Sequence, residues 1–280
     1  MMPIKSLLMR RPGGSWSPSQ LATPPRLWFN DDSSVTDAGS GACSQWNDVS
    51  GNSLHVTQNT SGARPTIVNN EQNGRRIIRF DGTDDYMTTT GANALNMWQN
   101  QGKGWIAAAY KKRNTDGAGT ARTVIAGDNG SLSTRLNMSA GSTIAANKPS
   151  SSARRLDADS AAQLTASATA AGSYVMALML MDWTNGDGFL WVNGALDVSN
   201  TSLTSSGNTS NTAGSRVTLG AFSSSLPAVN GFGDIDLAEI LCGRALPTST
   251  EIDKTFGYLA WRWGLAANLP AAHPYRYAAP

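Results

Sequence analysis

Nine short runs of apolar or alternating residues, bounded by Gly, Asn and Asp, restrict the fold of this chain more than any other feature. They lie at residues 27–29, 75–80, 104–110, 122–126, 134–138, 174–183, 188–192, 216–220 and 235–241. Runs of this kind are typical of β-strands. Between two of them, Asn193-Gly194 favours a tight hairpin. The pattern predicts an all-β fold, an antiparallel two-sheet jelly-roll sandwich.

One amphipathic helix is predicted near the C-terminus. Thr248 is a suitable N-cap, and Glu251 completes a capping box. Gly264 favours a left-handed stop, and Pro270 prevents continuation. Apolar residues recur at helical spacing as one stripe: Ile252, Phe256, Leu259, Ala260 and Trp263. The helix is therefore expected to cap a sheet and to bury Phe256 and Trp263.

Trp261 is predicted to point away from that sheet. It lies about 200° around the helix from Trp263. Because an exposed tryptophan lowers solubility, we expect a cover, either the tail at 269–277 folding back or a neighbouring subunit. The tail is the favoured cover. His273 is expected to form local hydrogen bonds, and Trp261, His273 and Tyr275 are candidate interface residues.

The chain divides into three predicted parts. Residues 1–25 contain three basic residues and prolines at 3, 12, 18, 24 and 25, which predicts an extended arm. The arm is either loose or ordered on assembly, and Arg10 and Arg11 are its candidate docking residues. Residues 26–246 form the predicted sandwich domain. Residues 247–280 form the helix and tail, packed on the sandwich.

Composition argues against several classes of protein. A net charge of +2 with 15% charged residues does not suit direct nucleic-acid binding. No apolar run reaches the roughly 20 residues that cross a bilayer, and the start is a poor secretory signal. Cys43 and Cys242 are expected to be buried thiols of a protein made in a reducing cytoplasm, with one disulfide as the alternative. The polar stretches 145–171 and 200–214 are expected to be surface loops.

Two segments near the front of the chain form a recognisable pair. One reads Gln45-Trp46-Asn47-Asp48-Val49-Ser50-Gly51-Asn52, and the other reads Arg79-Phe80-Asp81-Gly82-Thr83-Asp84-Asp85-Tyr86-Met87. With residues 188–194 and 233–241, they resemble the concanavalin A-like lectin/glucanase superfamily in its laminin-G-like jelly-roll form. The resemblance covers about residues 26–264, and Trp46, Asp48 and Phe80 are expected to be structural. This fold serves enzymes, lectins and structural modules alike.

The C-terminal residues narrow the resemblance to one group of jelly-roll proteins. Residues 251–265 read Glu-x-x-x-x-x-Gly-Tyr-Leu-Ala-Trp-x-Trp-Gly-Leu, and residues 269–275 read Leu-Pro-x-x-His-Pro-Tyr. This is similar to the terminus of jelly-roll proteins encoded by tailed bacteriophages. The resemblance implies a non-enzymatic structural protein of the virion, in the capsid decoration, neck, tail or fibre, made in the host cytoplasm. Its implied partners are other virion proteins and copies of itself.

Two further functions are weighed against this one. A module that binds host surface glycans would need an exposed aromatic residue, such as Trp98 or Trp105, beside Asn, Asp or Arg. A glycan hydrolase would require Asp234 and Glu239 in an open cleft. The segment Asp234-Ile-Asp236-Leu-Ala-Glu239 resembles the Glu-x-Asp-x-x-Glu strand of retaining glucanases, which implies a nucleophile at residue 234 and an acid/base at Glu239. Asp234 is one methylene too short for the nucleophile. We therefore favour solvated carboxylates on a strand whose inward residues are Ile235, Leu237 and Ile240.

Asp81, Asp84 and Asp85 form the candidate metal site. Calcium takes several oxygen ligands, and many folds of this type hold calcium. An Asp-Gly-x-x-Asp sequence is also ordinary turn chemistry, and this is the favoured interpretation. No other cofactor is predicted, and the two histidines of the chain, His55 and His273, are too far apart in sequence to suggest a catalytic set.

Overall fold

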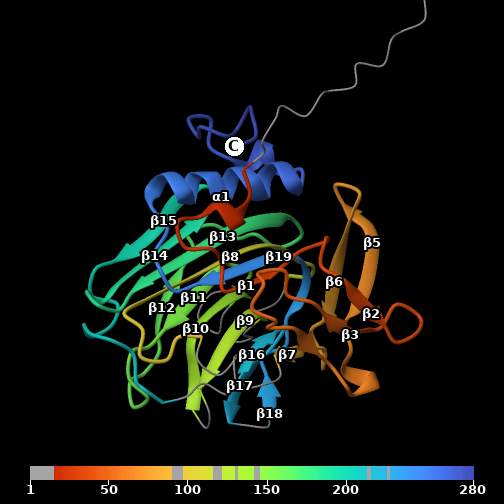
Figure 1. Cartoon of the computed structure of the whole chain (residues 1–280), viewed down its shortest axis with the longest axis horizontal. Helices are drawn as coiled ribbons and strands as arrows, with labels where there is room; N and C mark the ends of the chain where they lie inside the picture. Colours follow the sequence, from red (N-terminus) through yellow and green to blue (C-terminus); the bar gives the residue numbers. More distant parts are fainter. Residues whose placement is uncertain are drawn as a thin grey trace, which may run out of the picture.

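The chain forms a layered β-sandwich covered on one side by a helix. The structure, a computed structural model, describes residues 16–89, 97–115, 122–129, 132–141, 146–212, 216–225 and 228–280. In these residues, two large antiparallel sheets pack face to face, and one α-helix, α1 (Ser249–Arg262), lies on the outer face of one sheet (Figure 1). The predicted all-β sandwich with a C-terminal helix is confirmed.

The sheet under α1 has the order β15-β14-β13-β8-β19-β6-β5, and β1 also pairs with β19. Every residue of β13 and β19 is buried, because one face meets the second sheet and the other lies in the helix-covered layer. The strands are β1 (Leu27–Phe29), β5 (Thr66–Gln72), β6 (Arg75–Asp81), β8 (Lys103–Lys112), β13 (Tyr174–Asp182), β14 (Asp187–Val192), β15 (Ala195–Asn200) and β19 (Asp234–Gly243). Asn193 and Gly194 form the predicted tight turn between β14 and β15, with φ values of 50° and 82°.

The second sheet has the order β12-β11-β10-β9-β16-β7-β4-β3-β2, and β17 and β18 form a small separate sheet. Its strands are β2 (Val35–Asp37), β3 (Cys43–Trp46), β4 (Val56–Thr57), β7 (Met87–Thr89), β9 (Arg122–Asn129), β10 (Leu132–Gly141), β11 (Ser150–Ala153), β12 (Ala162–Thr165) and β16 (Arg216–Leu219). The small sheet pairs β17 (Phe222–Ser225) with β18 (Ala228–Asn230).

The prediction that residues 145–171 form a surface loop is wrong for two segments, which form the strands β11 and β12. Ser151 is buried and Ser152 half-buried in the sheet, where their hydroxyl groups find partners: Ser151 Oγ donates to the Asn137 carbonyl, and Ser152 Oγ donates to Asn137 Oδ1 at 2.9 Å. Polar side chains are compatible with burial when they are hydrogen-bonded in this way. Residues 201–212 do form the predicted loop without strands.

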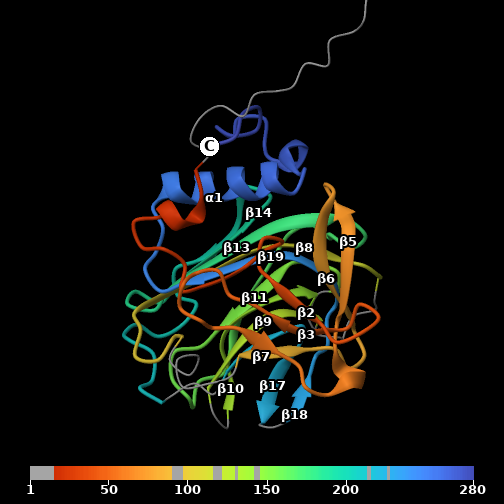
Figure 2. The ribbon, with the colours of Figure 1, turned by 45° about the vertical axis from the view of Figure 1, so that its right-hand side comes forward.

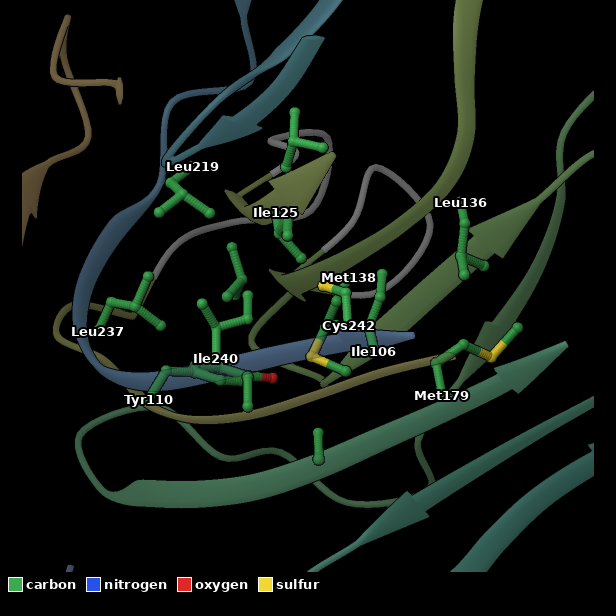
Figure 3. Packing of buried hydrophobic residues seen from close by; sticks show 14 of the residues in the cluster. Ile106, Tyr110, Ile125, Leu136, Met138, Met179, Leu219, Leu237, Ile240 and Cys242 are labelled. Atoms are coloured by element: carbon green, nitrogen blue, oxygen red, sulfur yellow. The ribbon is translucent and has the colours of Figure 1, made fainter. Parts of the chain in front are cut away.

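The core between the sheets is made of aliphatic, aromatic and methionine side chains. Trp46 and Phe29 pack together there, with ring centroids 5.2 Å apart, and Trp46 is 1% exposed. Cys43 and Cys242 are buried free thiols, as favoured, and burial raises the pKa of Cys43 to about 12. Figure 3 shows residues of the two sheets facing one another: Ile106, Tyr110, Met179, Leu237, Ile240 and Cys242 against Ile125, Leu136, Met138 and Leu219.

A second core lies between α1 and the sheet. The predicted stripe faces it, and Phe256 and Trp263 are 1% and 0% exposed. The capping box is present, because Thr248 N donates to Glu251 Oε2 and Glu251 N donates to Thr248 Oγ1. The helix ends at Arg262 with Trp263 as its C-cap, and the following Gly264 has a φ of 69°. The turn between β5 and β6 caps this end, because Asn73 Nδ2 donates to the Arg262 carbonyl.

Both ends of the described chain lie on the outer side of α1 (Figures 1 and 2). Trp16 N donates to the Pro280 carbonyl at 3.1 Å, and Ala22 N donates to Glu251 Oε1 at 2.7 Å. Residues 16–25 therefore belong to the body rather than to an extended arm, since Leu21 is buried against α1. Arg10 and Arg11 of the predicted arm lie outside the described residues.

The remaining helical turns are short. In the described part of the chain they are the 3-10 helices η1 (Pro18–Gln20), η2 (Ser61–Ala63) and η4 (Ala266–Asn268). Among the described helices, α1 included, none combines the length and the apolar character that crossing a bilayer requires.

Candidate functional site

Glu239, the predicted acid/base of a hydrolase, is enclosed beneath α1. It is 0% exposed on β19. Its Oε1 accepts hydrogen bonds from Trp28 Nε1 at 2.6 Å and from the Tyr258 hydroxyl at 2.9 Å. Its Oε2 accepts one from Trp263 Nε1 at 2.7 Å. A carboxylate held by three donors under a helix has no route to a sugar substrate.

Arg262 balances the charge of this carboxylate. Its Nε lies 3.5 Å from Glu239 Oε2, and its Nη2 contacts Asp31 and lies 2.6 Å from Asp32. Arg75 also pairs with Asp31, at 2.6 Å. Burial raises the pKa of Glu239, whereas Arg262 and the three hydrogen-bond donors oppose that rise. The network ties α1 to β19 and to the loop after β1.

The other two carboxylates of this strand are also buried. Asp236 is 0% exposed and pairs with Arg79 at 2.6 Å and with Lys111 at 2.9 Å. Asp234 is 3% exposed and pairs with Arg113. The prediction of solvated carboxylates is therefore wrong, because the covering helix and three basic side chains take the place of water. The inward packing of Ile235, Leu237 and Ile240 is confirmed.

The predicted metal cluster is a turn held by its own carboxylates. The ligand oxygens of Asp81, Asp84 and Asp85 lie within 4.8 Å of one another. Asp81 Oδ1 accepts from the backbone N–H of Thr83 at 2.8 Å, and Asp85 Oδ2 accepts from that of Asp81 at 3.0 Å. Burial and the Asp81 charge raise the pKa of Asp85 to about 6. These oxygens suit calcium in chemical type, but the contacts that the structure shows are those of a turn.

The C-terminal tail folds back over α1. Trp261 is 41% exposed, and its Nε1 donates to the Tyr275 carbonyl at 2.8 Å. His273 is buried beside the turn between β14 and β15, and its Nδ1 accepts from Tyr275 N at 3.2 Å. Burial lowers the pKa of His273. Trp261, His273 and Tyr275 thus lie together, but the tail covers Trp261 only in part.

Gly257 makes room for this tail. A Cβ at residue 257 would lie 2.6 Å from the Cβ of Tyr275. Gly257→Ala is expected to lower the free energy of unfolding by about 1–3 kcal/mol through overpacking. In a free helix, the same change would add about 1 kcal/mol of stability. Chemical denaturation shows whether the free energy of unfolding falls or rises. A rise would contradict the close packing of the tail against α1. Adding Tyr275→Gly, which removes the Cβ that the new methyl group meets, should relieve the overlap.

A cluster of amide, hydroxyl and guanidinium groups lies where three loop segments meet at one edge of the sandwich. We call it the polar rim, and it comprises Gln99, Asn100, Arg155, Asn208, Ser210 and Asn211. Backbone hydrogen bonds join the segments, from Asn100 N to the Ser210 carbonyl and from Ser210 N to the Arg155 carbonyl, each at 3.0 Å. The side chains bond as well: Asn208 Nδ2 donates to Asn100 Oδ1 at 3.2 Å.

Trp98 and Trp105 are not the exposed aromatics that a sugar could stack on. They are 3% and 1% exposed. Trp98 instead contacts the loop that carries Asn208 and Ser210, because its carbonyl accepts a hydrogen bond from Thr209 Oγ1 at 2.6 Å.

Sequence reasoning did not identify the polar rim as a site. The residues that contact one another across its segments lie 53 to 112 positions apart in the sequence. The available signals were the Ser/Thr/Asn-rich stretch at 200–214 and the pair Arg154-Arg155, in a chain with only 15% charged residues.

Comparison with known proteins identifies the fold. No family model and no curated protein matches the chain. Solved structures do match. The binding domain of Paraclostridial Mosquitocidal Protein 1 has a TM-score of 0.58 at 12% identity, covering 83% of this chain and 52% of that one. The ligand-binding domain of botulinum neurotoxin serotype D, in complex with N-acetylneuraminic acid, has 0.56 at 10%, covering 86% and 53%.

A third match is Trypanosoma rangeli sialidase in complex with sialic acid, with a TM-score of 0.54 at 13% identity, covering 84% of this chain and 33% of that one. This chain therefore spans about half the length of the toxin binding domains. At such identities, the likeness establishes the β-sandwich fold and nothing finer.

Proposed function

We propose that this protein is a non-enzymatic, lectin-like module that binds host glycans at the polar rim. The rim is the observation that carries the proposal. Because Trp98 and Trp105 are buried, neither supplies the exposed aromatic residue that was expected beside such a site, and the rim would bind a sugar through hydrogen bonds instead. Amide and hydroxyl groups both donate and accept hydrogen bonds, which suits the hydroxyl groups of a sugar. Because rim residues bond to one another across three segments, their side chains are held in place before a ligand arrives, which lowers the entropic cost of binding.

The structural neighbours support this class of function. One toxin domain was solved with N-acetylneuraminic acid and the sialidase with sialic acid. The enclosure of Glu239, Asp234 and Asp236 supports a binding role over hydrolysis by those residues.

A glycan array with labelled protein tests the proposal. We expect saturable binding to a subset of glycans and roughly ten-fold weaker binding by Asn208→Ala, because it loses hydrogen bonds to the sugar. The matched control is Asn59→Ala, another exposed asparagine, located before η2. A wild-type protein that binds no glycan would contradict a glycan site at the rim. So would an Asn208→Ala variant that binds glycans as tightly as Asn59→Ala does.

A second candidate, compatible with the first, is a structural component of a tailed-bacteriophage particle. The observation that favours it is the resemblance of residues 251–275 to the C-terminus of phage jelly-roll proteins. In the structure these residues pack together, because Gly257 lies against Tyr275 and Trp261 donates a hydrogen bond to the Tyr275 carbonyl. The partners would be other virion proteins and further copies of the chain. Mass spectrometry of purified particles should find the protein at fixed copy number, and its absence there would count against this candidate.

A further inference from the structure

We infer that the polar rim selects sugars that carry a carboxylate, and that Arg155 is the residue that selects them. This inference rests on the proposed glycan-binding function and names the class of ligand for the same site.

Arg155 is held in a fixed position by groups that leave its charge unbalanced. Its Nε donates to Ser205 Oγ at 2.8 Å, and its Nη1 donates to the Asn208 carbonyl at 3.3 Å. Its guanidinium lies against Gly207, where a Cβ would come within 3.4 Å of Nη1. The side chain is half-buried, and it forms no ion pair with a carboxylate of the described residues.

The neighbouring cations differ in this respect. Arg135 is 3% exposed and pairs with Asp157 at 2.5 Å. Lys103 is near Asp182, at 3.8 Å. An incoming anion can therefore reach Arg155 without displacing a carboxylate, whereas at Arg135 or Lys103 it would compete with Asp157 or Asp182. A guanidinium has five N–H donors in a planar fork, and two of these bonds leave others for a carboxylate.

The amides beside Arg155 fit the rest of a sugar ring. Asn208 Nδ2 donates to Asn100 Oδ1, so the Asn208 oxygen and the Asn100 nitrogen make no hydrogen bond to the described residues. One is an acceptor and the other a donor, and both residues are exposed. An acceptor and a donor beside a fixed cation match a sugar that has a carboxylate and neighbouring hydroxyls.

Matched pairs of glycans test the inference. The probes are sialyllactose against lactose, and oligogalacturonate against its methyl ester, titrated by calorimetry with the full chain. We expect at least one acidic member to bind roughly ten-fold more tightly than its neutral partner, with a preference that weakens as salt rises. Arg155→Gln should remove the preference and leave thermal stability unchanged.

Arg64→Gln is the matched control. Arg64 is also half-buried and also donates to backbone carbonyls, of Gln58 and Asn59, outside the rim. It should keep the preference. Equal binding of acidic and neutral glycans by the wild-type protein, or a preference that survives Arg155→Gln, overturns the inference while the glycan-binding function stands. Failure to bind any glycan of the array or the pairs overturns the proposed function itself.

Discussion

Replacing Glu239 by alanine is expected to lower the free energy of unfolding by about 3–5 kcal/mol, the usual cost of breaking a buried ion pair. The change leaves Arg262 without this partner and removes the acceptor for the side chains of Trp28, Tyr258 and Trp263. Unsatisfied buried donors add to the cost. Chemical denaturation, monitored by tryptophan fluorescence, measures the loss.

The control is Glu71→Ala. Glu71 also accepts from basic side chains, Arg79 and Lys111, each at 3.1 Å, but it is partly exposed. Surface ion pairs are worth about 0–1 kcal/mol, so the control should change little. If the two variants lose similar stability, the Glu239 network does not hold α1 on the sheet.

Asp48→Ala is the second change expected to have a large effect, at least about 3 kcal/mol, because hydrogen bonds to a charged group contribute about 1.5–3 kcal/mol each. The carboxylate is 8% exposed. Its Oδ1 accepts from Trp28 N at 2.9 Å and from Ser50 N at 3.0 Å. Its Oδ2 accepts from Leu54 N at 3.1 Å and from Ser50 Oγ at 2.7 Å. Asp48 therefore holds the turn of the Asp-Val-Ser-Gly-Asn segment in place through these four hydrogen bonds.

Asp37→Ala serves as its control. Asp37 accepts from Gly39 N at 2.8 Å and from Gly41 N at 3.1 Å, so it makes the same kind of contact in an exposed turn. Water can replace an exposed acceptor, so the loss should stay near 1 kcal/mol or below it, about the net contribution of one hydrogen bond. Equal losses at residues 37 and 48 would show that burial is not what makes Asp48 important.

Local signals made the helix predictable. Thr248, Glu251 and Gly264 set its ends, and the spacing of Phe256 and Trp263 set its buried face. The long apolar runs were predictable as strands for the same reason. The strand β5 and the short strands β11 and β12 were missed because they are polar. No residue of β5 is buried, and the hydrogen bonds that hold the serines of β11 come from Asn137 on another strand.

The site could not be predicted in the same way. Alternation along β19 places Glu239 away from the core between the sheets, and on a bare sheet that face would be solvated. Nothing within the strand shows that Tyr258 and Trp263 of a later helix will cover it. Arg155 likewise meets Asn208 only through the fold, 53 residues away.

The most direct test of the central claim, glycan binding at the polar rim, is to map the bound ligand on the protein by NMR. Backbone amide shifts of the full chain would be followed while the tightest glycan of the array is titrated. We predict that the shifts concentrate at residues 99–101, 155–157 and 205–211. Saturable shifts centred on α1, on the tail or on the turn at Asp81, with the rim unchanged, would contradict the claim.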